Sequence, residues 1–141
     1  MTNEQDAPSL TETEALAAAR AVTTLFQKWE LTDTEALDLL GGMTAETWSA
    51  WKAVTFGPVS PELGVRLSHL LGVHKALRVI FAGDEARVYG WVRLGNAAFG
   101  GLPALLMMRE ADASRPLHGE TPTSGLPHVR LHLEDQLAGD P

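Results

Sequence analysis

The chain contains no cysteine, and this absence removes disulfides, thiolate metal sites and cysteine nucleophiles together. No apolar run approaches the roughly 18 residues that a membrane-spanning helix needs, so we expect no membrane span. Basic residues are scarce at the start, because none precedes Arg20, whereas a secretory or transit leader begins with positive charge. These absences together predict a cytoplasmic protein.

Acidic residues outnumber basic ones by 18 to 11, and the 141-residue chain carries a formal net charge of -7. Phosphate contacts need a cationic surface, so this excess of acid argues against a general nucleic-acid binder. The one positive stretch is 58–83, which carries Arg66, Lys75 and Arg78 against Glu62. Hydrophobic residues at 45% and charged residues at 21% are typical of a globular chain with a sizeable core.

Apolar residues recur at three- and four-residue steps through most of the chain, which is the pattern of amphipathic helices. Ser9 or Thr11 can cap a first helix, with Glu12 or Glu14 at capping-box spacing. The apolar face of this helix comprises Leu16, Ala19, Val22, Leu25 or Phe26, and Trp29. No alternating strand pattern competes with the helical one, so we predict an all-α fold.

The next segment has the layout of a helix-turn-helix unit. Thr32 caps a short helix that carries Leu39 and Leu40, and the pair Gly41 and Gly42 ends it. A second short helix follows over 44–52. Two short helices joined by a glycine turn are typical of DNA-binding units and equally of plain helix packing, so both interpretations stay open.

The second half of the chain predicts further helices punctuated by glycine and proline. One begins at Pro61 and is closed by Gly72, and another continues to Phe81 and ends at Gly83. Asp84 caps a third. Two more helices cover 103–108, and 127 onward with Val129, Leu133 and Leu137 on one face. We therefore divide the chain into a disordered lead-in (1–9), a helix-turn-helix-like domain (10–57) and a small helical domain (58–141) with a mobile loop (111–125).

No constellation of catalytic residues stands out. The glycines between 95 and 101 match neither a dinucleotide-binding nor a P-loop pattern, and no serine lies in a nucleophile elbow. His128 and His132 have a spacing that could hold a metal, but no third ligand is evident, so we favour two solvent-facing histidines. We expect no enzyme activity, no cofactor and no metal site.

The four tryptophans are an unusual feature of the composition. They are Trp29, Trp48, Trp51 and Trp91. Burial in the core is the favoured interpretation, because an aromatic side chain buries a large area. Tryptophan is also common at binding hot spots, so an interaction face is the alternative.

Three segments resemble the Xre/MbcA/ParS-type antitoxins, the partners of RES-domain toxins. The first runs from the Trp29-Glu30-Leu31-Thr32-Asp33 segment to Leu39-Leu40-Gly41 and Thr47-Trp48-Ser49-Ala50-Trp51-Lys52-Ala53. The second runs from Ser60 through Arg66-Leu67-Ser68-His69-Leu70-Leu71-Gly72 to Phe81. The third comprises Trp91-Val92-Arg93, Asn96, Phe99-Gly100-Gly101, Ala104-Leu105, Met108, Val129-Arg130 and Leu133. The resemblance covers about 15–137, in the family's order, and departs from it at Gly95, where the family usually has proline.

The resemblance implies a helix-turn-helix-like domain followed by a toxin-binding domain, and an antitoxin of a type II system that is not itself an enzyme. In the family the toxin destroys cellular NAD and the C-terminal region of the antitoxin occludes its active site. Members are commonly homodimeric within a larger complex, and some repress their own operon. The toxin-binding residues implied here are Trp91, Arg93, Asn96, Phe99, Gly100, Gly101, Met108, Arg109, Arg130 and Leu133.

Physical chemistry agrees with part of this expectation. Gly100 and Gly101 beside Pro103 predict a rigid turn, and a preorganised turn binds a partner at low entropic cost. Arg93, Arg109 and Arg130 are expected to pair with carboxylates across the interface, although solvated arginines remain the alternative.

The second functional hypothesis is a transcriptional regulator that binds operator DNA through 33–52. Its candidate contacts are Thr44, Thr47, Trp48 and Lys52. The 44–52 helix has one cation and no arginine, whereas major-groove readout most often uses Arg, Lys, Asn or Gln. We therefore expect any binding to be weak, salt-dependent and dimer-dependent.

Overall fold

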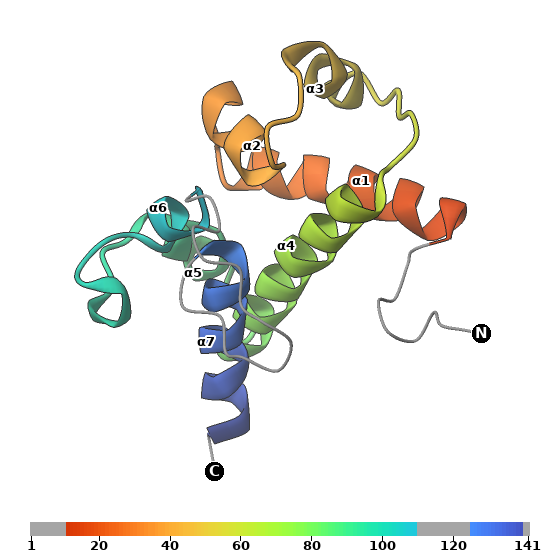
Figure 1. Cartoon of the computed structure of the whole chain (residues 1–141). Coiled ribbons are helices and arrows are strands. Elements are labelled where there is room, and N and C mark those ends of the chain that lie inside the picture. The colour runs from red at the N-terminus through yellow and green to blue at the C-terminus, as the bar shows by residue number, and fades with distance from the viewer. Residues whose placement is uncertain (1–10, 110–124, 140–141) are drawn as a thin grey trace.

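The computed structural model describes 11–109 and 125–139, and within these ranges the chain is helical without a strand (Figure 1). The elements are α1 (Glu12–Lys28), α2 (Asp33–Leu39), α3 (Ala45–Lys52), α4 (Pro61–Ile80), α5 (Glu85–Gly90), the 3-10 turns η1 (Trp91–Arg93) and η2 (Ala97–Phe99), α6 (Ala104–Arg109) and α7 (Gly125–Gly139). The predicted all-α class is confirmed. The expected lead-in 1–9 and nearly all of the expected loop 111–125 lie outside the described residues. No helix in the described ranges has the length and apolar character to cross a membrane.

Local capping chemistry sets the helix starts, as the sequence predicts. The Thr11 hydroxyl accepts a hydrogen bond from the Glu14 N–H, and the Glu14 carboxylate accepts one from the Thr11 N–H. Thr32 and Glu35 form the same reciprocal pair at the start of α2. These bonds satisfy N–H groups that have no partner inside the helix. The predicted start of the last helix at Pro127 is two residues late, because α7 begins at Gly125.

The helix α4 corrects the expectation that Gly72 ends a helix. The chain runs as one helix from Pro61 to Ile80, and Gly72 lies inside it. A Cβ atom on Gly72 would meet the guanidinium end of the Arg130 side chain, which comes from α7. The missing side chain at Gly72 therefore leaves room for Arg130 and does not mark a helix end.

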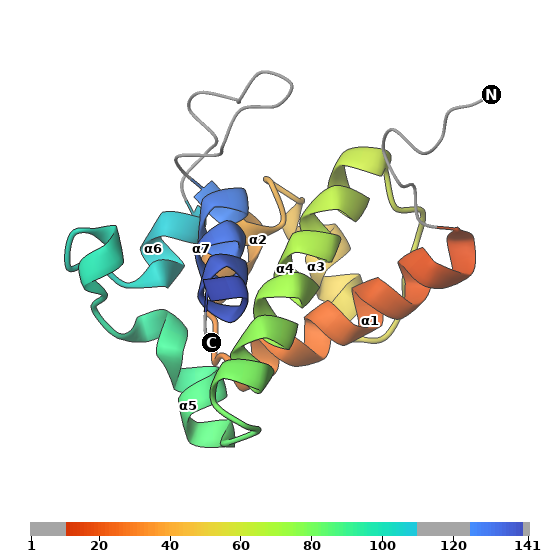
Figure 2. The same ribbon diagram turned by 90° about the horizontal axis from the view of Figure 1, so that it is seen from below.

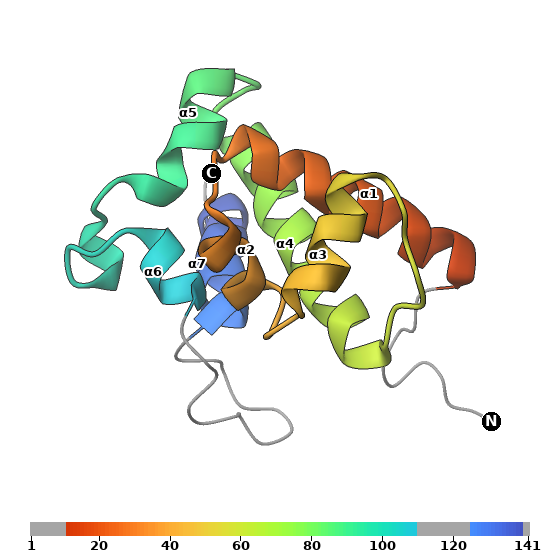
Figure 3. The same ribbon diagram turned by 90° about the horizontal axis from the view of Figure 1, so that it is seen from above.

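The helix α4 crosses the middle of the molecule, with α1 on one side and α7 on the other (Figure 2). The helix α3 packs against α1 and α2, and α2 also contacts α6 (Figure 3). One continuous hydrophobic core joins these layers, from Val22 and Trp29 in α1 through Leu70 in α4 to Leu133 in α7. The two units expected from the sequence, 10–57 and 58–141, share this core.

Three of the four tryptophans lie in the core. Trp29, Trp48 and Trp51 are buried, whereas Trp91 is partly exposed at the surface of the second half. The predicted face of α1 is wrong at one position: Leu16 is 41% exposed, and Ala15 and Ala18 are buried in its place. The small alanines allow α3 and α4 to approach α1 closely.

Candidate protein-binding surface

The segment 95–103 forms a tight turn, which we call the glycine turn. Gly95 and Pro103 form an isolated antiparallel bridge at its base. Inside it, the Asn96 N–H donates to the Leu102 carbonyl at 3.1 Å, and the Asn96 carbonyl accepts from the Gly101 N–H at 2.9 Å. The turn is therefore closed by its own backbone.

Glycine is required in this turn for two different reasons. Gly100 and Gly101 have φ angles of 69° and 86°, in the left-handed region that favours glycine. Gly95 has no positive φ, but a Cβ atom there would lie 2.7 Å from the Gly101 carbonyl oxygen. The two arms of the turn are thus too close together for a side chain at Gly95.

Three exposed leucines lie in or beside the glycine turn, and we call them the leucine face. Leu94 is 63% exposed, Leu102 is 48% exposed and Leu106 is 43% exposed. The segment that carries them lies at the edge of the molecule, away from α4 (Figure 1). Large apolar side chains exposed within one short stretch mark an interaction site more often than isolated ones do.

Three aromatic rings of this region pack against the ring of Phe99 in the glycine turn. Phe99 is buried, and the ring of Trp91 meets it edge-on at 6.4 Å between centroids. The rings of His128 and His132 also meet Phe99 edge-on, at 5.7 Å and 5.2 Å. His128 and His132 are partly exposed, so the expectation of two solvent-facing histidines holds only in part, because both also pack against this ring. The part of the chain that the structure describes contains no group of three metal-ligating side chains.

The implied toxin-binding residues divide by burial. Met108 and Leu133 belong to the core together with Phe99. Their side chains can affect a binding surface only indirectly, through the residues that pack on them. Trp91 and Asn96 are partly exposed, and Gly100 and Gly101 are exposed. The leucine face was not among the residues singled out from the sequence. No signal in the sequence marks all three leucines, because Leu94 and Leu102 adjoin glycines of the turn but Leu106 does not.

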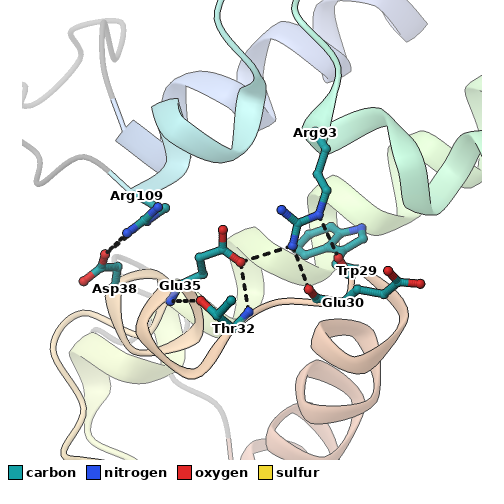
Figure 4. Close-up of polar contacts among 7 residues, drawn as sticks. All are labelled: Trp29, Glu30, Thr32, Glu35, Asp38, Arg93 and Arg109. Atoms are coloured by element: carbon teal, nitrogen blue, oxygen red, sulfur yellow. Dashed lines mark hydrogen bonds and ion pairs between the residues drawn. The ribbon is translucent and has the colours of Figure 1, made fainter.

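Arg93 is bound within the chain (Figure 4). Its Nε donates to the carbonyl of Trp29 at 3.2 Å, and its Nη2 donates to the carbonyl of Glu30 at 2.7 Å. The same Nη2 lies 3.1 Å from an oxygen of Glu35. Arg93 therefore holds the end of α1 and the start of α2 against η1.

Arg109 makes a second link between the same regions. Its Nε and Nη2 both donate to one oxygen of Asp38, at 3.1 Å and 2.9 Å (Figure 4). We call Arg93, Arg109 and their partners the arginine clasp. The clasp joins the first two helices to the segments on either side of the glycine turn.

Arg130 is also engaged inside the molecule. It pairs with Glu134 at 2.9 Å and donates to the Ser68 carbonyl at 3.3 Å, where α7 crosses α4. In this structure Arg93, Arg109 and Arg130 all have acceptors in their own chain, so they are not simply solvated, and their pairing with carboxylates of a partner stays a prediction.

Glu35 is the most enclosed acid of the clasp, with a side chain 14% exposed. Burial alone would raise the pKa of its carboxyl group, but hydrogen bonds from the Thr32 N–H and from Arg93 outweigh burial and lower it. Glu35 therefore stays charged opposite Arg93.

The helix-turn-helix-like segment uses its candidate DNA contacts for its own packing. The Trp48 indole N–H and the Lys52 ammonium both donate to one oxygen of Asp33, at 3.0 Å and 2.9 Å. These two hydrogen bonds lower the pKa of the Asp33 carboxyl group. The Thr44 hydroxyl accepts from the Thr47 N–H, which caps α3. Thr44 and Thr47 are both exposed and bond to each other, without a link to another helix.

The geometry described above defines an all-α protein with one closed, apolar turn at its edge. No family model matches the chain. It is 33% identical over 98 residues to the uncharacterized protein y4oB of Sinorhizobium fredii (strain NBRC 101917 / NGR234), across 70% of this chain and 74% of that protein. The chain belongs to the family of y4oB.

Proposed function

We propose that the chain is the antitoxin of a type II toxin-antitoxin system, which binds and occludes the active site of an NAD-degrading RES-domain toxin. The observation that carries the proposal is the leucine face on the glycine turn: Leu94, Leu102 and Leu106 are exposed beside a backbone that is closed by its own hydrogen bonds. The resemblance of the three segments to Xre/MbcA/ParS-type antitoxins supplies the kind of partner.

A closed turn suits this role energetically. Ordering a flexible loop on binding reduces affinity, whereas the glycine turn is ordered before a partner arrives. Fully burying an exposed leucine side chain contributes about 1.5–3 kcal/mol. The three leucines are already about half-buried, so covering each of them would contribute about half of that. The proposal includes a homodimer within the toxin complex, in the cytoplasm.

The decisive variant is Leu102→Asp. Its backbone bonds to Asn96 and Phe99 do not involve the side chain, so the turn is retained while a charge enters the apolar face. The matched control is Val65→Asp, because Val65 is equally exposed at 48% and lies on α4. Both variants are co-expressed with the RES-domain toxin encoded beside this gene, and growth and cellular NAD are followed.

We expect Val65→Asp to restore growth and NAD like the unmodified protein, and Leu102→Asp to fail although its far-ultraviolet circular dichroism is unchanged. If Leu102→Asp neutralises the toxin as well as the control does, the leucine face is not the binding surface. If the unmodified protein neither rescues growth nor forms a complex, the antitoxin proposal itself fails.

A further inference from the structure

A group of basic side chains lies at the C-terminal end of α4, and the proposed function does not use it. Lys75 and Arg78 line an open groove there together with His74, Val79, Ala82 and Gly83. The ring of His74 stacks on Tyr89 at 5.6 Å, and its Nε2 lies 3.3 Å from the Tyr89 hydroxyl. The Lys28 ammonium, from the end of α1, lies 5.7 Å from the centre of the Tyr89 ring. We call Lys28, Lys75 and Arg78 the basic cluster.

Like Arg20 on α1, the three members of the basic cluster have no acidic partner among the described residues. Within 11–109 and 125–139, five basic side chains lie within 4.0 Å of a carboxylate oxygen: Lys52, Arg87, Arg93, Arg109 and Arg130. Lys28, Lys75 and Arg78 form no such pair in the same ranges. The nearest ion pair along the chain is Arg87 with Asp84, at 3.7 Å, which occupies that carboxylate.

The charge of the groove comes from Lys75 and Arg78, and Lys28 contacts Tyr89, whose ring stacks on His74 of the groove. Burial and the nearby charge of Arg78 lower the pKa of His74, so its ring is neutral at neutral pH. Tyr89 and His74 therefore connect Lys28 to the groove that Lys75 and Arg78 line.

We propose that the basic cluster, and not α3, contacts the backbone phosphates of duplex DNA. Phosphate oxygens are acceptors, and lysine, arginine and tyrosine are the side chains that commonly donate to them. Affinity for DNA comes chiefly from unpaired cations that displace counterions, and Lys52 of α3 already pairs with Asp33.

Contacts of this kind read no base sequence, and the net charge of -7 opposes the approach of DNA. We therefore expect weak binding that is seen only at low salt. The inference does not depend on the proposed function, because the basic cluster shares no residue with the leucine face.

The test measures the salt dependence of binding to a labelled duplex of about 30 base pairs by fluorescence anisotropy. For about three phosphate contacts, log K should fall with log salt with a slope of about -2.7. Lys75→Gln and Arg78→Gln should each reduce the magnitude of the slope by about 0.9 and weaken binding to duplexes of any sequence equally. The matched control is Lys52→Gln, which removes one lysine from α3 and should leave the slope unchanged. Thermal unfolding of each variant verifies folding.

Three results would overturn the inference. One is the absence of binding to the duplex at low salt. Another is a slope that responds to Lys52→Gln but not to Lys75→Gln or Arg78→Gln, which would assign the contact to α3. The third is binding of a poly-glutamate peptide that depends on the cluster while the duplex does not bind, which would assign the cluster to an acidic protein segment.

Discussion

At the scale of single residues, glycine carries most of the information about the candidate surface. Gly100 and Gly101 occupy left-handed backbone, whereas at Gly95 and Gly72 another group lies where a Cβ atom would be. The group is a backbone carbonyl at Gly95 and the flexible side chain of Arg130 at Gly72. A carbonyl inside a closed turn cannot move as a side chain can, so Gly95 is the stricter position.

Gly95→Ala is therefore expected to destabilise the protein by about 1–3 kcal/mol, because the added methyl group would force the arms of the turn apart. Gly57→Ala is the matched control, since nothing lies within 4 Å of a Cβ atom there and its φ is not positive. That change should stay within about 0.5 kcal/mol of the unmodified protein or stabilise it slightly. Urea unfolding measures both. Equal stability of the two variants would show that the turn yields easily.

At the scale of elements, the arginine clasp explains how the segment with the leucine face is held against the first two helices. Arg93 donates to two carbonyls at the end of α1 and pairs with Glu35, whereas Arg109 pairs with Asp38 alone. Carbonyl groups at a helix C-terminus have no partner inside the helix and carry partial negative charge. The two arginines should therefore contribute unequally to stability.

Arg93→Ala is expected to lower the free energy of unfolding by about 1.5–3 kcal/mol, because three acceptors, one of them on the enclosed Glu35, lose a charged donor. Arg109→Ala should cost less than about 1 kcal/mol, because its partner Asp38 is exposed to water. Chemical denaturation of both variants at one pH tests the order. An Arg109→Ala variant as unstable as Arg93→Ala would contradict it.

The elements also show what the sequence could predict and why. Thr11, Thr32, Thr44, Ser60 and Asp84 were predictable helix caps, because a cap and its partner lie within three residues. The interpretation of Gly72 failed because the group that explains it, Arg130, comes from a distant helix. The partners of Arg93 were unpredictable for the same reason, since they lie more than fifty residues away.

At the scale of the whole molecule, one core unites the two units, 10–57 and 58–141, that the sequence pattern predicts. The site was predictable as a turn near Gly100 and Gly101, but not as the leucine face. Leu94 and Leu102 lie outside the helices, and only the exposure of the three side chains in the folded chain distinguishes them from core leucines.

A shared core predicts a single cooperative unfolding transition. Tryptophan fluorescence reports chiefly on Trp29, Trp48 and Trp51 in the first half, whereas far-ultraviolet circular dichroism reports on all helices. We expect the two signals to change at the same urea concentration. An earlier transition by either signal would mean that 10–57 and 58–141 unfold separately.

The closure of the glycine turn limits how the length of this segment can vary among related sequences. Because the bridge between Gly95 and Pro103 fixes both ends and the backbone between them bonds to itself, an inserted or deleted residue would open the ring instead of lengthening a loop. Natural variation among relatives should then substitute residues within this stretch while preserving its length. Insertions should accumulate instead in connections such as 53–60, where no bridge closes the chain on itself.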